Sequence, residues 1–295
     1  MSCPRRAAVL RTGRKEKSLE TGFFIGKDKS RRYFRSWKAG PSSAGTIVLI
    51  HGYAEHGGRY NEMAAELNSA GFDVWAQDHY GHGKSEGKRA DVPDFQLFAD
   101  DTDLFVSRHV EPENKKKPLF VYGHSMGGAI ALLYTLRRQS EIQGLILSGP
   151  IVRPGAQSSS FERKLSHFLR KIAPGFRYLP FDAALLCHDR KVVDDYRSDP
   201  LVYTGKMKIR MADEFLHAEK LLSDERLKDV RLPVLMMHGT DDRTVLPLNS
   251  ETVEKLISSE DKQRHLFEGM YHEIHNEPEK EGVFSLMKSW LRKHL

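Results

Sequence analysis

The hexapeptide Gly123-His-Ser-Met-Gly-Gly128 constrains the fold of this chain more than any other stretch, because of what flanks it. Leu119–Tyr122 before it has the composition of a short buried strand, and Gly128–Leu136 after it has that of a helix. Small residues are needed where a strand turns at once into a helix, because the two elements approach closely there. Placed in this way, Gly-x-Ser-x-Gly predicts a nucleophile elbow that holds Ser125 beside a helix N-terminus, rather than a loop serine with glycines for turn geometry.

Short apolar runs alternate with helical stretches along most of the chain. Strands without a polar face are typical of parallel sheets, which are covered on both sides. The runs are Thr46–His51, Phe72–Ala76, Leu119–Tyr122, Gly144–Ser148, Val234–His238 and the shorter His265–Phe267, after a hairpin of Thr21–Ile25 and Arg32–Trp37. The predicted helices are Tyr60–Ala70, Phe95–His109, Gly128–Gln139, Ser250–Ser258 and Gly282–Leu295. This alternation predicts an α/β fold, with a mostly parallel eight-stranded sheet and helices on both faces.

The alternation stops between Pro150 and Arg231, where prolines separate helical pieces and no buried strand is predicted. An insertion at this point follows the sixth strand, so it would lie over the carboxyl ends of the strands. We therefore predict a helical cap, or lid. The predicted division of the chain is a basic arm at 1–19, a core at 20–150 and 232–295, and the cap at 151–231.

The first helix predicted in the cap is amphipathic. Its apolar face carries Phe161, Leu165, Phe168, Leu169 and Ile172, and lysines and arginines occupy the other side. Such a helix either faces a membrane or packs its apolar side on the body of the protein, and the sequence leaves both readings open.

The positive charge of the chain is concentrated at its N-terminus. The net charge is +6, but residues 1–38 hold twelve lysines and arginines against three acids, which leaves about −3 for the remainder. Such an arm either attracts anionic lipid or is a solvated tail. No aromatic–basic pattern or zinc spacing indicates nucleic-acid binding. No secretory signal or apolar run of about 18 residues is visible, and two cysteines make no disulfide framework, so a cytoplasmic location is expected.

Groups that could activate Ser125 follow it in the order Asp, then His, that this type of fold requires. Asp241 and Asp242 follow the strand Val234–His238, and His272 and His275 follow the last short strand. Spacing alone does not choose between the two carboxylates or between the two imidazoles.

An oxyanion formed at Ser125 needs backbone donors. The expected donors are the N–H of Met126, directly after the nucleophile, and that of Tyr53, in the loop after the third strand. The Tyr53 side chain is expected to crowd the entrance. No metal site and no cofactor are expected.

These motifs together resemble the α/β-hydrolase fold, and within it the monoacylglycerol lipase and lysophospholipase branch. The resemblance covers about 20–295 and is carried by His51–Tyr60, Asp78–Ser85, Gly123–Gly128, Ser198–Leu201, His238–Arg243 and Tyr271–His272. It implies that Asp242 is the acid and His272 the base. It also implies a cap over an acyl tunnel, with a polar end that holds glycerol. The positions matching this polar end are Glu55, Arg59, His275 and Tyr196, although Glu55 and Arg59 could instead form an ion pair that braces the loop.

The resulting prediction is a serine hydrolase that cleaves monoacylglycerols through an acyl-enzyme, with peripheral membrane contact through the cap and the arm. The alternatives are a lysophospholipase or a broad carboxylesterase on the same triad. A non-catalytic interaction protein on this scaffold is disfavoured, because such proteins usually lack a triad member. Aspartate-nucleophile hydrolases are disfavoured too, because Ser125 stands where their Asp would be.

Overall fold

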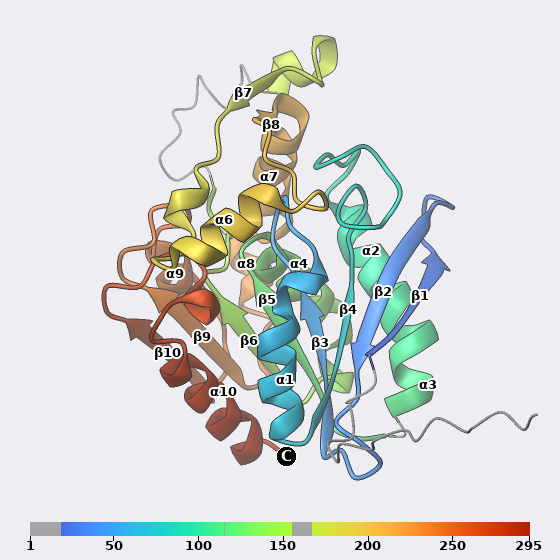
Figure 1. Ribbon diagram of the computed structural model, residues 1–295, viewed down its shortest axis with the longest axis vertical. Coiled ribbons are helices and arrows are strands. Elements are labelled where there is room, and N and C mark those ends of the chain that lie inside the picture. The colour runs from blue at the N-terminus through green and yellow to red at the C-terminus, as the bar shows by residue number, and fades with distance from the viewer. Residues whose placement is uncertain (1–18, 115, 155–166) are drawn as a thin grey trace, which may run out of the picture.

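The computed structural model describes residues 19–114, 116–154 and 167–295. The predicted arm, apart from Leu19, and the first part of the amphipathic cap helix lie outside the described residues. Eight strands form one sheet in the order β1-β2-β4-β3-β5-β6-β9-β10 (Figure 1). Their bounds are β1 Leu19–Ile25, β2 Arg31–Trp37, β3 Gly45–Ile50, β4 Phe72–Gln77, β5 Leu119–His124, β6 Gly144–Ser148, β9 Val234–Gly239 and β10 Lys262–Phe267.

The sheet is antiparallel at one edge and parallel elsewhere. The pairs β1/β2 and β2/β4 are antiparallel, and the five remaining pairs, from β4/β3 to β9/β10, are parallel. The predicted hairpin and the mostly parallel eight-stranded sheet are therefore confirmed. One predicted strand was too short: β10 begins at Lys262, because its first residues are polar and face solvent at the sheet edge.

Helices cover both faces of the sheet because alternate residues of the buried strands point to opposite sides. In β3, Val48 and Ile50 join a core under α2 and α4, whereas Ile47 and Leu49 join a core under α1 and α10. The bounds of these helices are α1 Asn61–Ser69, α2 Gln96–Phe105, α4 Met126–Arg138 and α10 Glu281–Lys293. Shorter elements are η1 Gly57–Tyr60, η2 Val106–Val110, α3 Glu111–Asn114, η3 Gln139–Glu141, α9 Leu248–Leu256 and η5 Ile274–Asn276.

The segment between β6 and β9, called the insertion below, adds no strand to the main sheet. Residues 167–172 are helical, and the elements that follow are β7 Arg177–Leu179, η4 Ala183–Leu185, α6 Arg190–Ser198, β8 Met207–Lys208, α7 Ile209–Leu221 and α8 Asp224–Leu227. The pair β7/β8, which was not predicted, forms a small antiparallel sheet. Figure 1 shows β7, β8, α6 and α7 above the upper ends of the central strands.

No helix in the described part of the chain is both long enough and apolar enough to cross a bilayer.

Candidate active site

Ser125 occupies a strained turn between β5 and α4. Its backbone has φ 54° and ψ −119°, in the left-handed region that L-residues rarely adopt, and its N–H donates to the Ser148 carbonyl at 3.0 Å. The flanking glycines are required by close approach. A Cβ on Gly123 would collide with the Gly127 carbonyl, and one on Gly127 would collide with the Ile50 carbonyl. The sequence therefore folds locally into the predicted elbow, which places the serine at the tip of β5 and the start of α4.

Asp242 and His272 lie together, as the resemblance implied. Asp242 Oδ2 is 2.6 Å from His272 Nδ1, and Asp242 Oδ1 accepts the backbone N–H groups of Thr244 and Val245 at 2.9 and 2.8 Å. The neighbouring Asp241 is exposed. The two carboxylates that spacing left equivalent are thus distinguished by the loop after β9, which turns Asp242 inward.

The surroundings of Asp242 and His272 favour the ionised carboxylate and the protonated imidazole. Burial alone would raise the pKa of Asp242, but His272 and His238 beside it hold that pKa well below its usual range. Burial alone would lower the pKa of His272, but the Asp242 carboxylate outweighs it and raises that pKa above the ordinary imidazole value. A carboxylate that stays ionised keeps the imidazole in one orientation and stabilises the imidazolium.

Ser125 and His272 both line a cavity of about 710 Å³, which lies within the range typical of small-molecule sites. Its wall is mostly apolar. The apolar lining residues come largely from the insertion and from the loop after β9: Leu169, Phe176, Leu179, Phe181, Leu185, Leu186, Met207, Ile209, Phe215, Leu216, Val245, Leu246 and Leu248. Glu55, Tyr196 and Glu273 also line the cavity; all three contact Arg59, so they lie together, and they are called the polar end below. Other polar lining residues include Arg153, Asp182, Arg243, Thr244 and Asn249.

The loop after β3 is held in place by Glu55. Its Oε1 accepts the Gly52 N–H at 2.6 Å and the Tyr60 hydroxyl at 2.7 Å. Gly52 lies against the nucleophile, because a Cβ built on it would be 3.3 Å from Ser125 Cβ. Tyr53 also lines the cavity, and its hydroxyl donates to the Ala90 carbonyl at 3.1 Å.

Met126 is buried and is the first residue of α4. Its N–H therefore has no acceptor within the helix, which leaves it free for an oxyanion at Ser125.

Arg59 joins the loop after β3, called the oxyanion loop below for its predicted role, to the loop of His272. Its guanidinium pairs with Glu55 Oε2 at 2.8 Å and makes two hydrogen bonds to Glu273, at 2.5 and 2.8 Å. Burial alone would raise the pKa of Glu273, but Arg59 holds it well below its usual range. The bracing ion pair considered from the sequence is therefore present.

Of the four expected head-group residues, the structure brings only Glu55 and Tyr196 to the cavity wall. Arg59 and His275 are not among the described residues that line it. The ring of His275 instead stacks on Tyr60 with centroids 4.8 Å apart, and neither ring nitrogen has a hydrogen-bond partner among the described residues. Arg59 is engaged in salt bridges and His275 packs on Tyr60, so this geometry gives no support to the prediction that these two residues contact the head group.

Tyr196 lines the cavity and has an unpaired polar atom. The residue is 3% exposed, and its hydroxyl has no hydrogen-bond partner among the described residues. The Arg59 guanidinium lies 4.6 Å from the centre of its ring and fixes the ring by a cation–π contact. A buried hydroxyl without a partner costs free energy unless a ligand supplies one.

Sequence reasoning missed three residues near this site. Glu273 lines the cavity and carries the Arg59 pair, and His238 Nε2 lies 3.1 Å from Asp242 Oδ2. Asp199 of the insertion lies 2.9 Å from His56 Nε2, which ties the insertion to the oxyanion loop. Their sequence positions could have indicated them, because each of the three lies within or directly after a stretch already singled out for another residue.

Five buried histidines surround the site without contacting a carboxylate. They are His51, His79, His82, His124 and His275, and burial lowers the pKa of each, to about 3 for His79 and about 4 for His82 and His275. Their neutral rings serve as packing and as hydrogen-bond partners: His51 Nε2 accepts the backbone N–H of His79 at 3.1 Å.

A family model and similar proteins with known names point to the same family. The family described as "Serine aminopeptidase, S33" matches residues 41–279. A monoacylglycerol lipase of Mycolicibacterium smegmatis is 34% identical over 92% of this chain and 96% of its own. Monoglyceride lipase of Homo sapiens is 32% identical over 98% of this chain and 95% of its own.

Among solved structures, a soluble variant of monoglyceride lipase from Saccharomyces cerevisiae, in complex with a substrate analog, superposes with a TM-score of 0.82. It is 26% identical to this chain, and the match covers 98% of this chain and 99% of that one. Matches of this length and identity include both the sheet and the insertion. The chain therefore belongs to the serine aminopeptidase S33 family of α/β-hydrolases, on the branch that holds the monoacylglycerol lipases.

Proposed function

We propose that this protein hydrolyses monoacylglycerols to a fatty acid and glycerol. The observation that carries the proposal is the cavity itself: a mostly apolar space of about 710 Å³ that is lined by Ser125, His272 and the three residues of the polar end. An acyl chain fits the apolar part because its burial is favourable by about 25 cal/mol per Å². A head group with free hydroxyls fits the polar end. The similar lipases named above act on this class of ester.

Catalysis would proceed through a covalent acyl-enzyme. Ser125 Oγ attacks the ester carbonyl, and its proton passes to His272 Nε2, since Nδ1 is engaged by Asp242. The N–H groups of Met126 and Tyr53 would stabilise the oxyanion. Collapse of the tetrahedral intermediate breaks the bond to glycerol, which leaves with the proton from His272. Water then attacks the acyl-enzyme with His272 as the base, releases the fatty acid and restores Ser125.

Glycerol would be held at the polar end. The Tyr196 hydroxyl, which has no partner among the described residues, can donate to or accept from a glycerol hydroxyl. Within the described ranges, Glu55 Oε2 accepts a hydrogen bond from Arg59 alone, so one of its lone pairs remains for a second hydroxyl. Both residues line the cavity.

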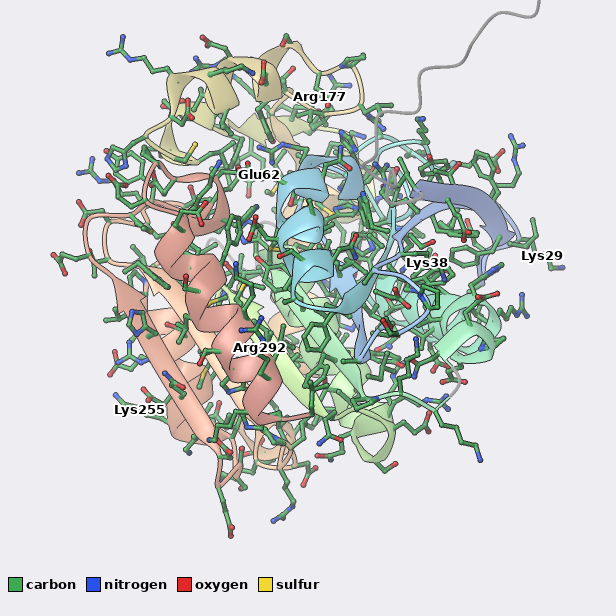
Figure 2. The ribbon with its side chains drawn as sticks, turned by 60° about the horizontal axis from the view of Figure 1, so that its bottom comes forward. Lys29, Lys38, Glu62, Arg177, Lys255 and Arg292 are labelled. Atoms are coloured by element: carbon green, nitrogen blue, oxygen red, sulfur yellow. The ribbon has the colours of Figure 1, made fainter. Side chains whose placement is uncertain are left out.

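The insertion would act as the predicted cap and would contact lipid. Phe168, Ile172 and Phe176 are 58%, 64% and 58% exposed; the exposed Lys171 lies between the first two in the sequence, and the exposed Arg177 directly follows Phe176. Apolar side chains flanked by basic ones suit an anionic leaflet, such as the cytoplasmic one, which accords with the predicted cytoplasmic location. Figure 2 shows Arg177 at the insertion end of the molecule, away from Arg292 on α10.

The proposal is tested by hydrolysis of a monoacylglycerol, a lysophospholipid and a short aryl ester by the wild type and by Tyr196→Phe. If glycerol occupies the polar end, Tyr196→Phe lowers kcat/KM for the monoacylglycerol about tenfold, the cost of one hydrogen bond, and leaves the aryl ester unchanged. The matched control is Tyr203→Phe, whose hydroxyl donates to the Lys206 carbonyl in an exposed loop. A lysophospholipid preferred over the monoacylglycerol, or equal losses on ester and monoacylglycerol, would reject the assignment.

A further inference from the structure

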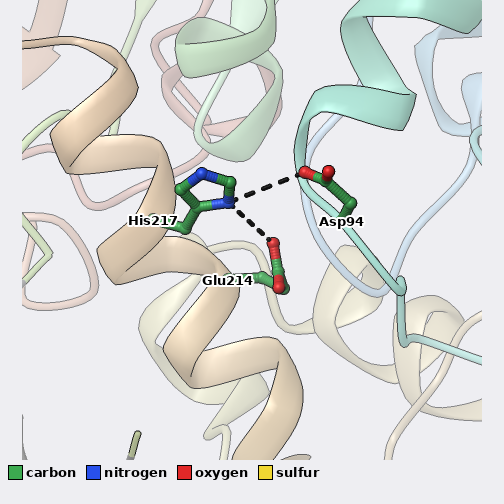
Figure 3. Close-up of side chains that lie close together, drawn as sticks. All are labelled: Asp94, Glu214 and His217. Carbon is green, nitrogen blue, oxygen red and sulfur yellow. Dashed lines mark hydrogen bonds and ion pairs between the residues drawn. The ribbon is translucent and has the colours of Figure 1, made fainter.

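Three potential metal ligands converge between α7 and the segment before α2, away from the cavity. Glu214 and His217 lie three residues apart on α7, so they face the same side of the helix, and Asp94 approaches from the core (Figure 3). His217 Nδ1 is 3.3 Å from Glu214 Oε2 and 3.6 Å from Asp94 Oδ1. All three ligand atoms lie within 4.8 Å of one another.

The two separations from His217 Nδ1, 3.3 and 3.6 Å, are close to the edge of a metal coordination tetrahedron. Ligands bound to zinc at about 2.0–2.1 Å and at the tetrahedral angle are about 3.3–3.4 Å apart. One imidazole nitrogen with two carboxylates is a donor set that zinc accepts, and it leaves a fourth position for water. We propose that Asp94, Glu214 and His217 form a binding site for a divalent transition metal such as zinc, which links the insertion to the core.

The surroundings of Glu214 prepare it as a ligand. The residue is 1% exposed, and its Oε2 accepts the Phe95 N–H at 2.6 Å, which fixes the carboxylate while leaving that oxygen a further lone pair. Its other oxygen, Oε1, is 2.7 Å from the Arg170 guanidinium. Hydrogen-bonding neighbours of this kind orient a side chain that binds a metal and tune its basicity.

The local charge also permits a cation. Arg170 and Lys220 are positive and line the same hollow of about 310 Å³, but Arg170 is 2.7 Å from Asp213 Oδ2 as well as from Glu214. Three carboxylates therefore stand against two fixed positive charges before a metal binds. A second imidazole, His167, lies 3.4 Å from Asp213 on the same side.

A metal here would tie a wall of the cavity to the core. Ile209, Phe215 and Leu216 of α7 line the cavity, whereas Asp94 precedes α2, which packs on α4. The site would thus restrain α7, and its existence does not depend on which ester the cavity accepts.

Metal binding is measured directly by titrating the metal-free protein with Zn²⁺ by calorimetry, and with Co²⁺ by its visible absorption, which reports tetrahedral coordination. The variants are His217→Gln and Asp94→Asn, both at partly or fully exposed positions. The control is His265→Gln, an exposed histidine on β10. We expect one metal per chain in the wild type and in the control, and a loss of affinity of at least tenfold in either site variant.

Thermal unfolding gives a second readout that does not involve activity. Zinc at about one hundred times the wild-type Kd should raise Tm by about 5 °C in the wild type and the control, and by no more than about half of that in the site variants. If His217 only forms an ion pair with the two carboxylates, zinc will not bind, or it will bind equally to wild type and site variants. Either result overturns the proposal.

Discussion

Replacing Asp242 by asparagine tests the proposed triad with almost no change in shape. In the wild type, Asp242 Oδ2 faces two donors, because His272 Nδ1 is 2.6 Å away and His238 Nε2 is 3.1 Å away. The tautomer of His238 is fixed, since its Nε2 also lies 2.7 Å from the Val245 carbonyl, which can only accept. Asp242 Oδ1 meanwhile accepts two backbone N–H groups.

No orientation of an asparagine amide satisfies these groups. With its oxygen on the two backbone N–H groups, its NH2 faces His272 Nδ1, which must then become an acceptor and carry its proton on Nε2. A base protonated at Nε2 cannot take the proton of Ser125. With the amide reversed, two buried backbone N–H groups lose their acceptor, at about 1–3 kcal/mol each. The first orientation is therefore expected, with kcat lowered about 10⁴-fold, or about 5 kcal/mol of transition-state stabilisation.

The assay is steady-state hydrolysis of a monoacylglycerol and of an aryl ester by Asp242→Asn, with urea unfolding to confirm that the variant is folded. Asp241→Asn is the matched control, because Asp241 is exposed and, among the described residues, its carboxylate accepts a hydrogen bond only from the Thr240 hydroxyl. It should retain the wild-type kcat within a factor of two. A folded Asp242→Asn that kept more than a tenth of kcat would refute the tautomer argument.

Four further outcomes are expected. Ser125→Ala should lose both turnover and covalent labelling by a fluorophosphonate, and residual hydrolysis by that variant would exclude the acyl-enzyme. Glu55→Ala should lower stability, because it orphans three buried donors, and should reduce kcat/KM for the monoacylglycerol and the aryl ester together; a loss confined to the monoacylglycerol would make Glu55 a head-group ligand alone. The five buried histidines have folded pKa values below the unfolded value of about 6.5. Their contribution to the free energy of unfolding is therefore present above that pH and is lost as the pH falls below it. The free energy of unfolding should fall by up to about 1.4 kcal/mol per pH unit for each of them, offset by His272, whose pKa is raised; a flat urea-unfolding profile from pH 6.5 to 5 would contradict this. Phe168→Glu should weaken binding to anionic vesicles, which salt should also weaken, as followed by flotation; wild type that stays unbound at low salt would argue for packing instead.

The elbow and the sheet could be predicted from sequence because their causes are local. A serine between Gly123 and Gly127 needs a close strand–helix approach, and those glycines are the positions where a Cβ would collide with backbone. Buried strands such as β3 are visible because both of their faces are apolar. The edge strand β10 was underestimated for the same reason, since most of its side chains face water and give no apolar run.

Contacts between distant segments could not be predicted in the same way. Arg59 and Glu273 are 214 residues apart, and no spacing rule indicates that one guanidinium bridges the oxyanion loop and the loop of the base. Without that bridge, Arg59 looked like a head-group ligand. The choice between Asp241 and Asp242 likewise depends on how the loop after β9 turns, and the family resemblance supplied it where spacing did not.

The difference between features set by local sequence and contacts between distant segments also explains where related enzymes can differ. Ser125, Met126 and the loop after β3 lie at strand ends, and their positions are set by the sheet. The wall of the cavity depends instead on side chains of the insertion, such as Leu169, Phe176 and Leu185. Exchanging one of these changes the space open to an acyl chain without moving the nucleophile. Acyl-chain preference is therefore expected to follow the insertion, and the chemistry to follow the sheet.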